Sequence, residues 1–154
     1  MFYEDLSAYE YVEDDTFEAE GTPHFWVSFR PTYERLAVGW LENGRPCTKG
    51  PVPVAFTEKL AAIQNVQRVN LCRGWHFCDL CPRPGEPARG NGEVRIPGGP
   101  GTVYAAPFLI GHYISAHAYR PPQVFIDAVM AVNLGEWAAA EVPFSRIPAD
   151  ADRI

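Results

Sequence analysis

Residues 72–81 read CRGWHFCDLC, and residues 112–117 read HYISAH. The first stretch contains a C-x2-C pair and the second an H-x4-H pair, with 30 residues between the pairs. Two thiolates at that spacing can reach one tetrahedral ion from a tight turn, and histidines separated by three to five residues are typical of structural zinc sites. The spacing therefore predicts a single Zn²⁺ site with four ligands, which are Cys78, Cys81, His112 and His117.

The segment between the two pairs is expected to fold as a β-hairpin that leads into a helix. Residues 93–96 (EVRI) and 102–105 (TVYA) are β-prone and flank the turn PGGPG. Residues 107–118 (PFLIGHYISAHA) are helical in pattern and begin with proline, which suits a first helical turn. A knuckle, a hairpin and a ligand-bearing helix in this order are the layout of treble-clef-like zinc domains, an analogy that concerns the fold alone.

The histidine pair sets a geometric condition. On a regular helix, residues five positions apart are rotated by about 140°, so His112 and His117 would not share a face. They converge only if the last turn loosens, and Pro121 favours a helix end there. His112 could instead be a core histidine, and His76 or Cys72 could replace one ligand. We expect Cys47, in an isolated turn, to take no part.

The number of ligands decides between two roles for the ion. Four Cys and His ligands close the tetrahedron and favour a structural site, whereas three ligands and a water favour catalysis. Without metal, the C-x2-C pair would be a redox dithiol or two buried free thiols. Zinc is the default ion for a mixed tetrahedron, although the same ligands could hold iron.

The rest of the chain predicts a single α+β domain with a small antiparallel sheet and about three helices. Residues 25–30 and 35–41 are expected to pair as antiparallel strands, and 53–66 and 123–134 to form helices with apolar residues at helical spacing. The expected organisation is an acidic, aromatic N-terminal segment, a zinc-binding domain and a C-terminal tail, at residues 1–24, 25–137 and 138–154.

Charge is distributed unevenly along the 154 residues, whose net charge is −6. Eight carboxylates and no Lys or Arg lie in residues 1–20, so the remainder has thirteen basic and eleven acidic side chains. We expect a loosely structured, solvated start, with docking to a basic partner as the alternative. The aromatic anchors for such a partner would be Tyr3, Tyr9, Tyr11 and Phe17.

The composition also argues against several classes of protein. An acidic chain is a poor non-specific binder of nucleic acid unless its arginines gather on one face. The arginines available for such a face are Arg73, Arg83, Arg89, Arg95 and Arg120. The sequence contains no run of about 18 apolar residues, so it predicts no membrane-spanning helix. The start lacks the layout of a secretory signal, so we expect a reducing cytoplasm, where four cysteines favour metal over two disulfides.

Familiar catalytic motifs do not occur. The chain has no H-x-E as in zinc deaminases, no HExxH, no phosphate-binding G-x4-G-K-[ST] loop and no G-x-S-x-G elbow. Polar and aromatic groups near the C-x2-C pair are nevertheless compatible with an enzymatic function.

Three runs, at 73–82 (RGWHFCDLCP), 92–107 (GEVRIPGGPGTVYAAP) and 109–126 (LIGHYISAHAYRPPQVFI), resemble a small family of uncharacterised bacterial proteins. The opening YEDLSAYEY at 3–11 and AVGWL at 37–41 also resemble that family. The resemblance covers most of the chain and implies that the CxxC and HYxxxH segments belong to one zinc-binding domain. It implies no activity.

Two functions follow from these patterns. The first is a cytoplasmic zinc-binding module that binds or regulates a protein partner, of which an antitoxin-like or immunity-like inhibitor would be one form. The second is a zinc-dependent hydrolase or lyase acting on a small molecule, with His76 or Asp79 as its acid or base. An open, three-ligand site beside a polar pocket would favour the enzyme, and a closed site would favour the module.

Overall fold

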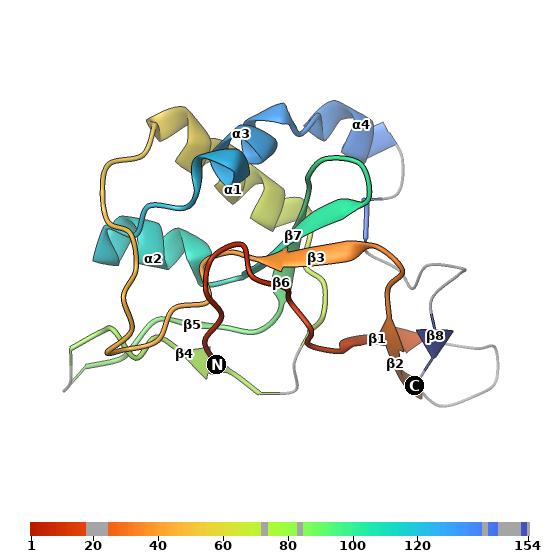
Figure 1. Ribbon diagram of the computed structural model, residues 1–154, viewed down its shortest axis with the longest axis horizontal. Coiled ribbons are helices and arrows are strands. Elements are labelled where there is room, and N and C mark those ends of the chain that lie inside the picture. Colours follow the sequence, from red (N-terminus) through yellow and green to blue (C-terminus); the bar gives the residue numbers. More distant parts are fainter. Residues whose placement is uncertain (18–24, 72–73, 83–84, 140–141, 145–151, 154) are drawn as a thin grey trace.

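The computed structural model describes residues 1–17, 25–71, 74–82, 85–139, 142–144 and 152–153. These residues form an α+β fold with two three-stranded sheets, one two-stranded sheet and four helices, as the sequence predicts for the fold class (Figure 1). Its elements, in chain order, are β1 (Glu13–Phe17), β2 (Phe25–Arg30), β3 (Glu34–Ala37), α1 (Val54–Val66), β4 (His76–Phe77), β5 (Arg89–Gly90), β6 (Glu93–Pro97), β7 (Thr102–Pro107), α2 (Ile110–His117), α3 (Gln123–Ala131), α4 (Leu134–Ala139) and β8 (Asp152–Arg153).

The central sheet has the strand order β3-β7-β6, with β7 in the middle. The hairpin expected between residues 93 and 105 is confirmed as β6 and β7, whose register places Ile96 opposite Tyr104 and Arg95 opposite Ala105. β3 runs parallel to β7, so this sheet is mixed and not purely antiparallel.

The expected antiparallel pairing of residues 25–30 with residues 35–41 is wrong. β2 instead pairs with β1 and β8 in a separate sheet, whereas β3 joins the free edge of β7. The link between β2 and β3 contains Pro31 and no glycine turn of the kind that closes a tight hairpin. The edge of β7 also allows Ala37 to be completely buried, and this burial favours the parallel pairing.

Three helices cover one side of the central sheet, where α1, α3 and α4 lie above β7 in Figure 1. The expected helices at 53–66 and 123–134 are confirmed as α1 and α3, although α3 ends at Ala131. Phe56 of α1 meets Phe125 of α3 edge-on at 6.3 Å between ring centroids, and Phe125 also contacts Tyr104 of β7. The sequence did not predict α4, which buries Trp137. Among the described helices, none has both the length and the apolar character that crossing a membrane requires.

The N-terminal segment, which we expected to be loose, packs along β3. The backbone N–H groups of Leu6 and Tyr9 donate to the carbonyls of Ala37 and Arg35. The ring of Tyr9 stacks on Trp40 with 5.1 Å between centroids and is 3% exposed. The segment therefore turns its aromatic side toward the protein. The side chain of Phe17 lies outside the described residues.

A charged network lies beneath Tyr9. The Glu93 carboxylate forms an ion pair with Arg95, and both side chains are buried. Glu93 Oε1 also accepts hydrogen bonds from the Tyr9 hydroxyl at 2.5 Å and the Asn70 amide at 2.7 Å. Arg95 lies 5.5 Å from the centroid of the Tyr9 ring, a cation–π distance. The network ties the N-terminal segment to the start of the hairpin.

Replacing Glu93→Gln is expected to lower the free energy of unfolding by about 3–5 kcal/mol, because the buried Arg95 charge would lose the carboxylate that pairs with it. Urea denaturation of the wild type and the variant measures this loss. The control is Glu58→Gln on the exposed surface of α1, which should change stability by less than about 0.5 kcal/mol. Equal small effects for both variants would contradict a structural role for the pair.

Asp5 offers a test that depends on pH. Its Oδ1 atom accepts hydrogen bonds from the Tyr119 hydroxyl at 2.8 Å and the Gly39 N–H at 2.9 Å. Burial nevertheless raises the pKa of this carboxyl above its ordinary value. Folding therefore favours the protonated form, so the stabilising contribution of Asp5 is present below its unfolded pKa and is lost as pH rises through its folded pKa.

Asp5→Asn is expected to be at least as stable as the wild type at neutral pH, since the amide oxygen can still accept both hydrogen bonds. The advantage should disappear near pH 4 and below, where Asp5 is protonated. Urea midpoints of both proteins between about pH 3 and pH 7 measure the difference. An Asn variant that is less stable at neutral pH would show that the charge itself is needed.

Candidate metal centre

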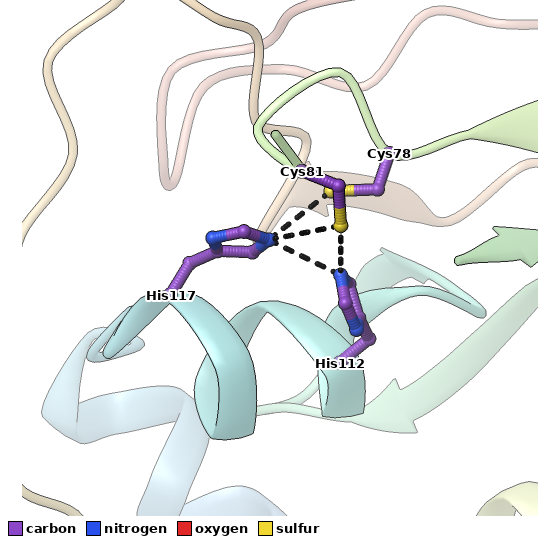
Figure 2. Close-up of side chains that lie close together, drawn as sticks. All are labelled: Cys78, Cys81, His112 and His117. Atoms are coloured by element: carbon purple, nitrogen blue, oxygen red, sulfur yellow. Dashed lines mark hydrogen bonds between the residues drawn. The ribbon is translucent and has the colours of Figure 1, made fainter. Parts of the chain in front are cut away.

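The structure brings Cys78, Cys81, His112 and His117 together. Each offers one ligand atom, and the four atoms all lie within 4.8 Å of one another. Figure 2 shows both imidazole rings rising from α2 toward the two sulfur atoms, which come from the loop after β4. These four side chains could hold a metal ion.

Three of the six separations between the ligand atoms are close to those around a tetrahedral ion. The Sγ atom of Cys78 lies 3.3 Å from Nε2 of His117, and that of Cys81 lies 3.3 Å from Nε2 of His112. The two Nε2 atoms are 3.1 Å apart. With Zn–S of about 2.3 Å and Zn–N of about 2.0 Å, a tetrahedron requires about 3.5 Å between sulfur and nitrogen and about 3.3 Å between the nitrogens. The cluster is therefore already close to the size that one zinc ion needs.

The end of α2 brings the two histidines together. Ala118, which follows the helix, has a left-handed backbone with φ of 55°, and its N–H donates to the carbonyl of Tyr113. That bond spans five residues, one more than in a regular α-helix, so the final turn is wide. His117 consequently turns back toward His112, with 4.9 Å between ring centroids. The expected loosening of the last turn is confirmed.

The two cysteines are positioned by the small hairpin of β4 and β5. The N–H of Cys78 donates to the carbonyl of Ala88 at 2.8 Å, which continues the pairing of β4 with β5. Cys78 is 1% exposed, and Cys81 is partly buried. Both are free thiols and form no disulfide. The arrangement leaves the two sulfur atoms facing α2 from the two ends of a turn, with two residues between the cysteines.

Burial favours the neutral forms of this cluster, which suits metal binding at the histidine and opposes it at the thiol. It raises the pKa of the Cys78 thiol and lowers the pKa of the His112 imidazole, with His117 adding to the second shift. A neutral imidazole is the form that binds metal. A bound cation would reverse the preference of the thiols, because a coordinated thiol is deprotonated.

The other candidate residues take different positions. His76 is exposed on β4 and does not join the four-residue cluster, although it lines a nearby pocket that none of the four side chains lines. Asp79 accepts a hydrogen bond from the N–H of Asn43 at 3.1 Å. Cys47 packs against the main core, away from the cluster. Cys72 lies outside the described residues.

The arginines proposed for a nucleic-acid face do not share one environment. Arg95 is buried with Glu93, Arg120 donates to the carbonyl of Pro51 and to Gln123, and Arg89 stacks on Trp75. Arg73 and Arg83 lie outside the described residues. Of the three that the structure describes, Arg95 is therefore too deeply buried to join an exposed basic face.

Sequence analysis missed the network around Glu93. A signal was present, because Glu93 and Arg95 are two residues apart and therefore point to the same side of a strand. Their neighbours Val94 and Ile96 are completely buried. Charged side chains alternating with apolar ones are usually interpreted as a solvated strand face. Only the packing of the N-terminal segment over β6 shows that this face is enclosed.

Comparison with known protein families identifies a match over most of the chain. The family described as a domain of unknown function (DUF7919) matches residues 1–130. This range contains the complete Cys/His cluster and the hairpin between its two pairs. Searches of curated proteins and of solved structures find no significant match.

The variants Cys81→Ser and His112→Ala are each expected to lose bound metal, because either change removes one of the four converging atoms. Metal analysis of the purified proteins measures the loss. Cys47→Ser is the matched control and should keep the metal content of the wild type, since Cys47 lies outside the cluster. Retention of a full complement of metal by both ligand variants would contradict the assignment.

Proposed function

The chain belongs to the DUF7919 family, a domain of unknown function, and we propose that it is a protein-interaction module stapled by one structural Zn²⁺ ion. The proposed ligands are Cys78, Cys81, His112 and His117. The observation that carries the proposal is the convergence of these four atoms within 4.8 Å, with sulfur–nitrogen and nitrogen–nitrogen separations of 3.1–3.6 Å where they are closest. The ion would join the β4–β5 hairpin to α2, which are distant in sequence and connected here through these side chains.

The donor set supports zinc and a structural role. Two thiolates with two imidazoles in a tetrahedral arrangement suit zinc, with iron as the principal competitor. Four protein ligands leave no position for a substrate, and structural zinc sites are closed in this way. Such a site contributes about 10 kcal/mol or more of folding free energy. Cys47, Cys78 and Cys81 form no disulfide, which is typical of a reducing compartment and supports the cytoplasm.

An interaction role is supported by the surface of the hairpin that the ion would hold. Trp75 and Phe77 are 51% and 47% exposed, and both flank His76. Exposed large aromatic side chains on a fixed element are typical of binding surfaces. The acidic N-terminal segment is a weaker candidate for the main contact, because Tyr9 is buried against Trp40. Exposed Glu4 and Glu10 remain available on that segment for a basic partner.

The enzyme hypothesis has less support. It requires an open coordination position, and its proposed acid or base residues should face the ion. His76 lies outside the four-residue cluster, and Asp79 is engaged with the backbone of Asn43. Both observations favour the structural site.

Removal of zinc is expected to unfold the protein or greatly lower its thermal midpoint, because the binding energy contributes directly to folding. The test compares thermal unfolding monitored by circular dichroism before and after chelation, and again after one equivalent of Zn²⁺ is restored. Recovery of the original midpoint supports a structural role for the zinc ion. An unchanged midpoint after complete removal of the ion would contradict it.

Cobalt substitution tests whether the site is closed. Co²⁺ in place of zinc should give the intense visible absorption of a tetrahedral site with sulfur ligands, and added azide should leave that spectrum unchanged. The absence of a response is expected because four side chains complete the coordination. A new azide-dependent band would show an open position and favour the enzyme.

A further inference from the structure

A hollow opens between the first residues of the chain and the loop that follows β3. Its volume is about 550 Å³, and its wall is formed by residues 2–5, Leu41 and residues 45–48. Small-molecule sites have volumes of about 300–1,000 Å³, and a cavity of roughly 150 Å³ already accommodates benzene. None of the four residues of the candidate metal centre lines this hollow. It is therefore a second candidate site, separate from the metal centre.

Asp5 presents a carboxylate that the protein holds in one orientation at this hollow. Its Oδ1 atom accepts hydrogen bonds from the Tyr119 hydroxyl at 2.8 Å and from the Gly39 N–H at 2.9 Å. Gly39 has a φ of 74°, and a Cβ there would lie 3.3 Å from the Tyr119 ring, so this close approach favours glycine. Tyr119 is completely buried. The carboxylate is thus oriented before any ligand arrives, which lowers the entropic cost of binding.

The second oxygen of Asp5, Oδ2, is accessible to a ligand. Among the described residues, the hydrogen bonds to this carboxylate all end on Oδ1. In the same part of the chain, no enclosed side-chain oxygen lacks a hydrogen-bond partner, so Oδ2 must be reached by solvent. Since Asp5 lines the hollow, Oδ2 can accept a hydrogen bond from a donor inside it. Glu4, which is exposed and also lines the hollow, adds negative charge beside Asp5.

Arg45 brings a positive charge to the same hollow. Its guanidinium lies 5.2 Å from the ring centroid of Phe2, and both residues belong to the wall. Arg45 is exposed and forms no ion pair with any residue that the structure describes. A guanidinium held on an aromatic ring can still bind a carboxylate through its N–H groups. Leu41 and Pro46 add apolar surface to the wall.

The combination of charges favours one class of ligand. A molecule with only negative charge would meet the carboxylates of Glu4 and Asp5, and one with only positive charge would meet Arg45. Like charges placed together oppose binding. These carboxylates also do not belong to a group that could hold a metal ion, since in the described part of the chain such a group occurs only at the candidate metal centre. The wall therefore favours an organic molecule with one group of each sign.

We propose that this hollow binds a small zwitterionic molecule with an ammonium group, a carboxylate and an aliphatic side group, which is the chemistry of a free amino acid and of a short peptide. The ammonium group would donate to Oδ2 of Asp5, and the carboxylate would pair with Arg45. The aliphatic group would pack on Leu41 and Pro46. This function goes beyond the proposed interaction module, because the hollow shares no residue with the metal centre.

Isothermal titration calorimetry of the full chain tests the proposal with leucine, leucyl-leucine and trileucine, which distinguish a free amino acid from a short peptide. At least one of them should bind with a Kd of about 1 mM or lower. Acetylation of its amino group, or amidation of its carboxylate, should each weaken binding by about tenfold, which corresponds to about 1.4 kcal/mol and one charge-assisted hydrogen bond. The proposal is overturned if none of the three binds, or if either blocked form binds as tightly as its parent.

Two variants test the residues, and each has a matched control. Asp5→Asn keeps an oxygen that can accept both hydrogen bonds but removes the charge, and should weaken binding by about tenfold. Arg45→Gln should weaken it by about fivefold or more. Glu58→Gln and Arg89→Gln make the same changes of charge at exposed positions outside the hollow, and Arg89 also lies on an aromatic ring. These controls should change affinity by less than about twofold. Wild-type affinity in Asp5→Asn or Arg45→Gln would contradict the assigned contacts.

Cys47 reports whether the ligand occupies the hollow. Its thiol is free and partly buried, and it belongs to the wall. Saturating ligand should slow the alkylation of Cys47 by iodoacetamide in the zinc-loaded protein, as measured by mass spectrometry of the peptide that contains it. An unchanged rate would place the ligand elsewhere and overturn the proposal. A protein that holds no zinc, or that is unaffected by chelation, would instead overturn the proposed function and leave this test intact.

Discussion

The convergence of two sulfur and two nitrogen atoms at one point is the constraint on which the rest of the structure depends. These atoms come from a turn after β4 and from α2, which are separated by the β6–β7 hairpin. The two-stranded β4–β5 sheet is too small to be stable alone in water. A cation bound by the four ligands would hold the β4–β5 sheet against α2, so that the position of the sheet would not depend on its few backbone hydrogen bonds.

A second constraint acts on β6, the first strand of the β6–β7 hairpin. Glu93 and Arg95 are buried together, and the Tyr9 hydroxyl binds the same carboxylate. This network fixes the N-terminal segment over β6, whereas the metal cluster fixes β4 and β5 beside it. A small pocket lined by Tyr9 and His76 lies between these two fixed regions. The shape of this pocket therefore depends on both the Cys/His cluster and a buried ion pair.

Much of this arrangement could be predicted from local patterns. The C-x2-C and H-x4-H spacings identified the four side chains that meet, and alternating β-prone residues around PGGPG predicted the β6–β7 hairpin. The pairing of β3 with β7 could not be predicted, because a parallel partner distant in sequence leaves no turn signal. The docking of Tyr9 was missed for a similar reason, since an acidic composition hides which few side chains become buried.

X-ray absorption at the zinc edge of the purified protein tests the central claim most directly, because it reports the atoms bound to the ion. We expect one zinc per chain with two sulfur neighbours at about 2.3 Å and two nitrogen neighbours at about 2.0–2.1 Å. The Cys81→Ser protein, if any zinc remains, should lose one sulfur neighbour. A zinc-free protein, or a shell with only one sulfur or with a bound water, would contradict the closed structural site.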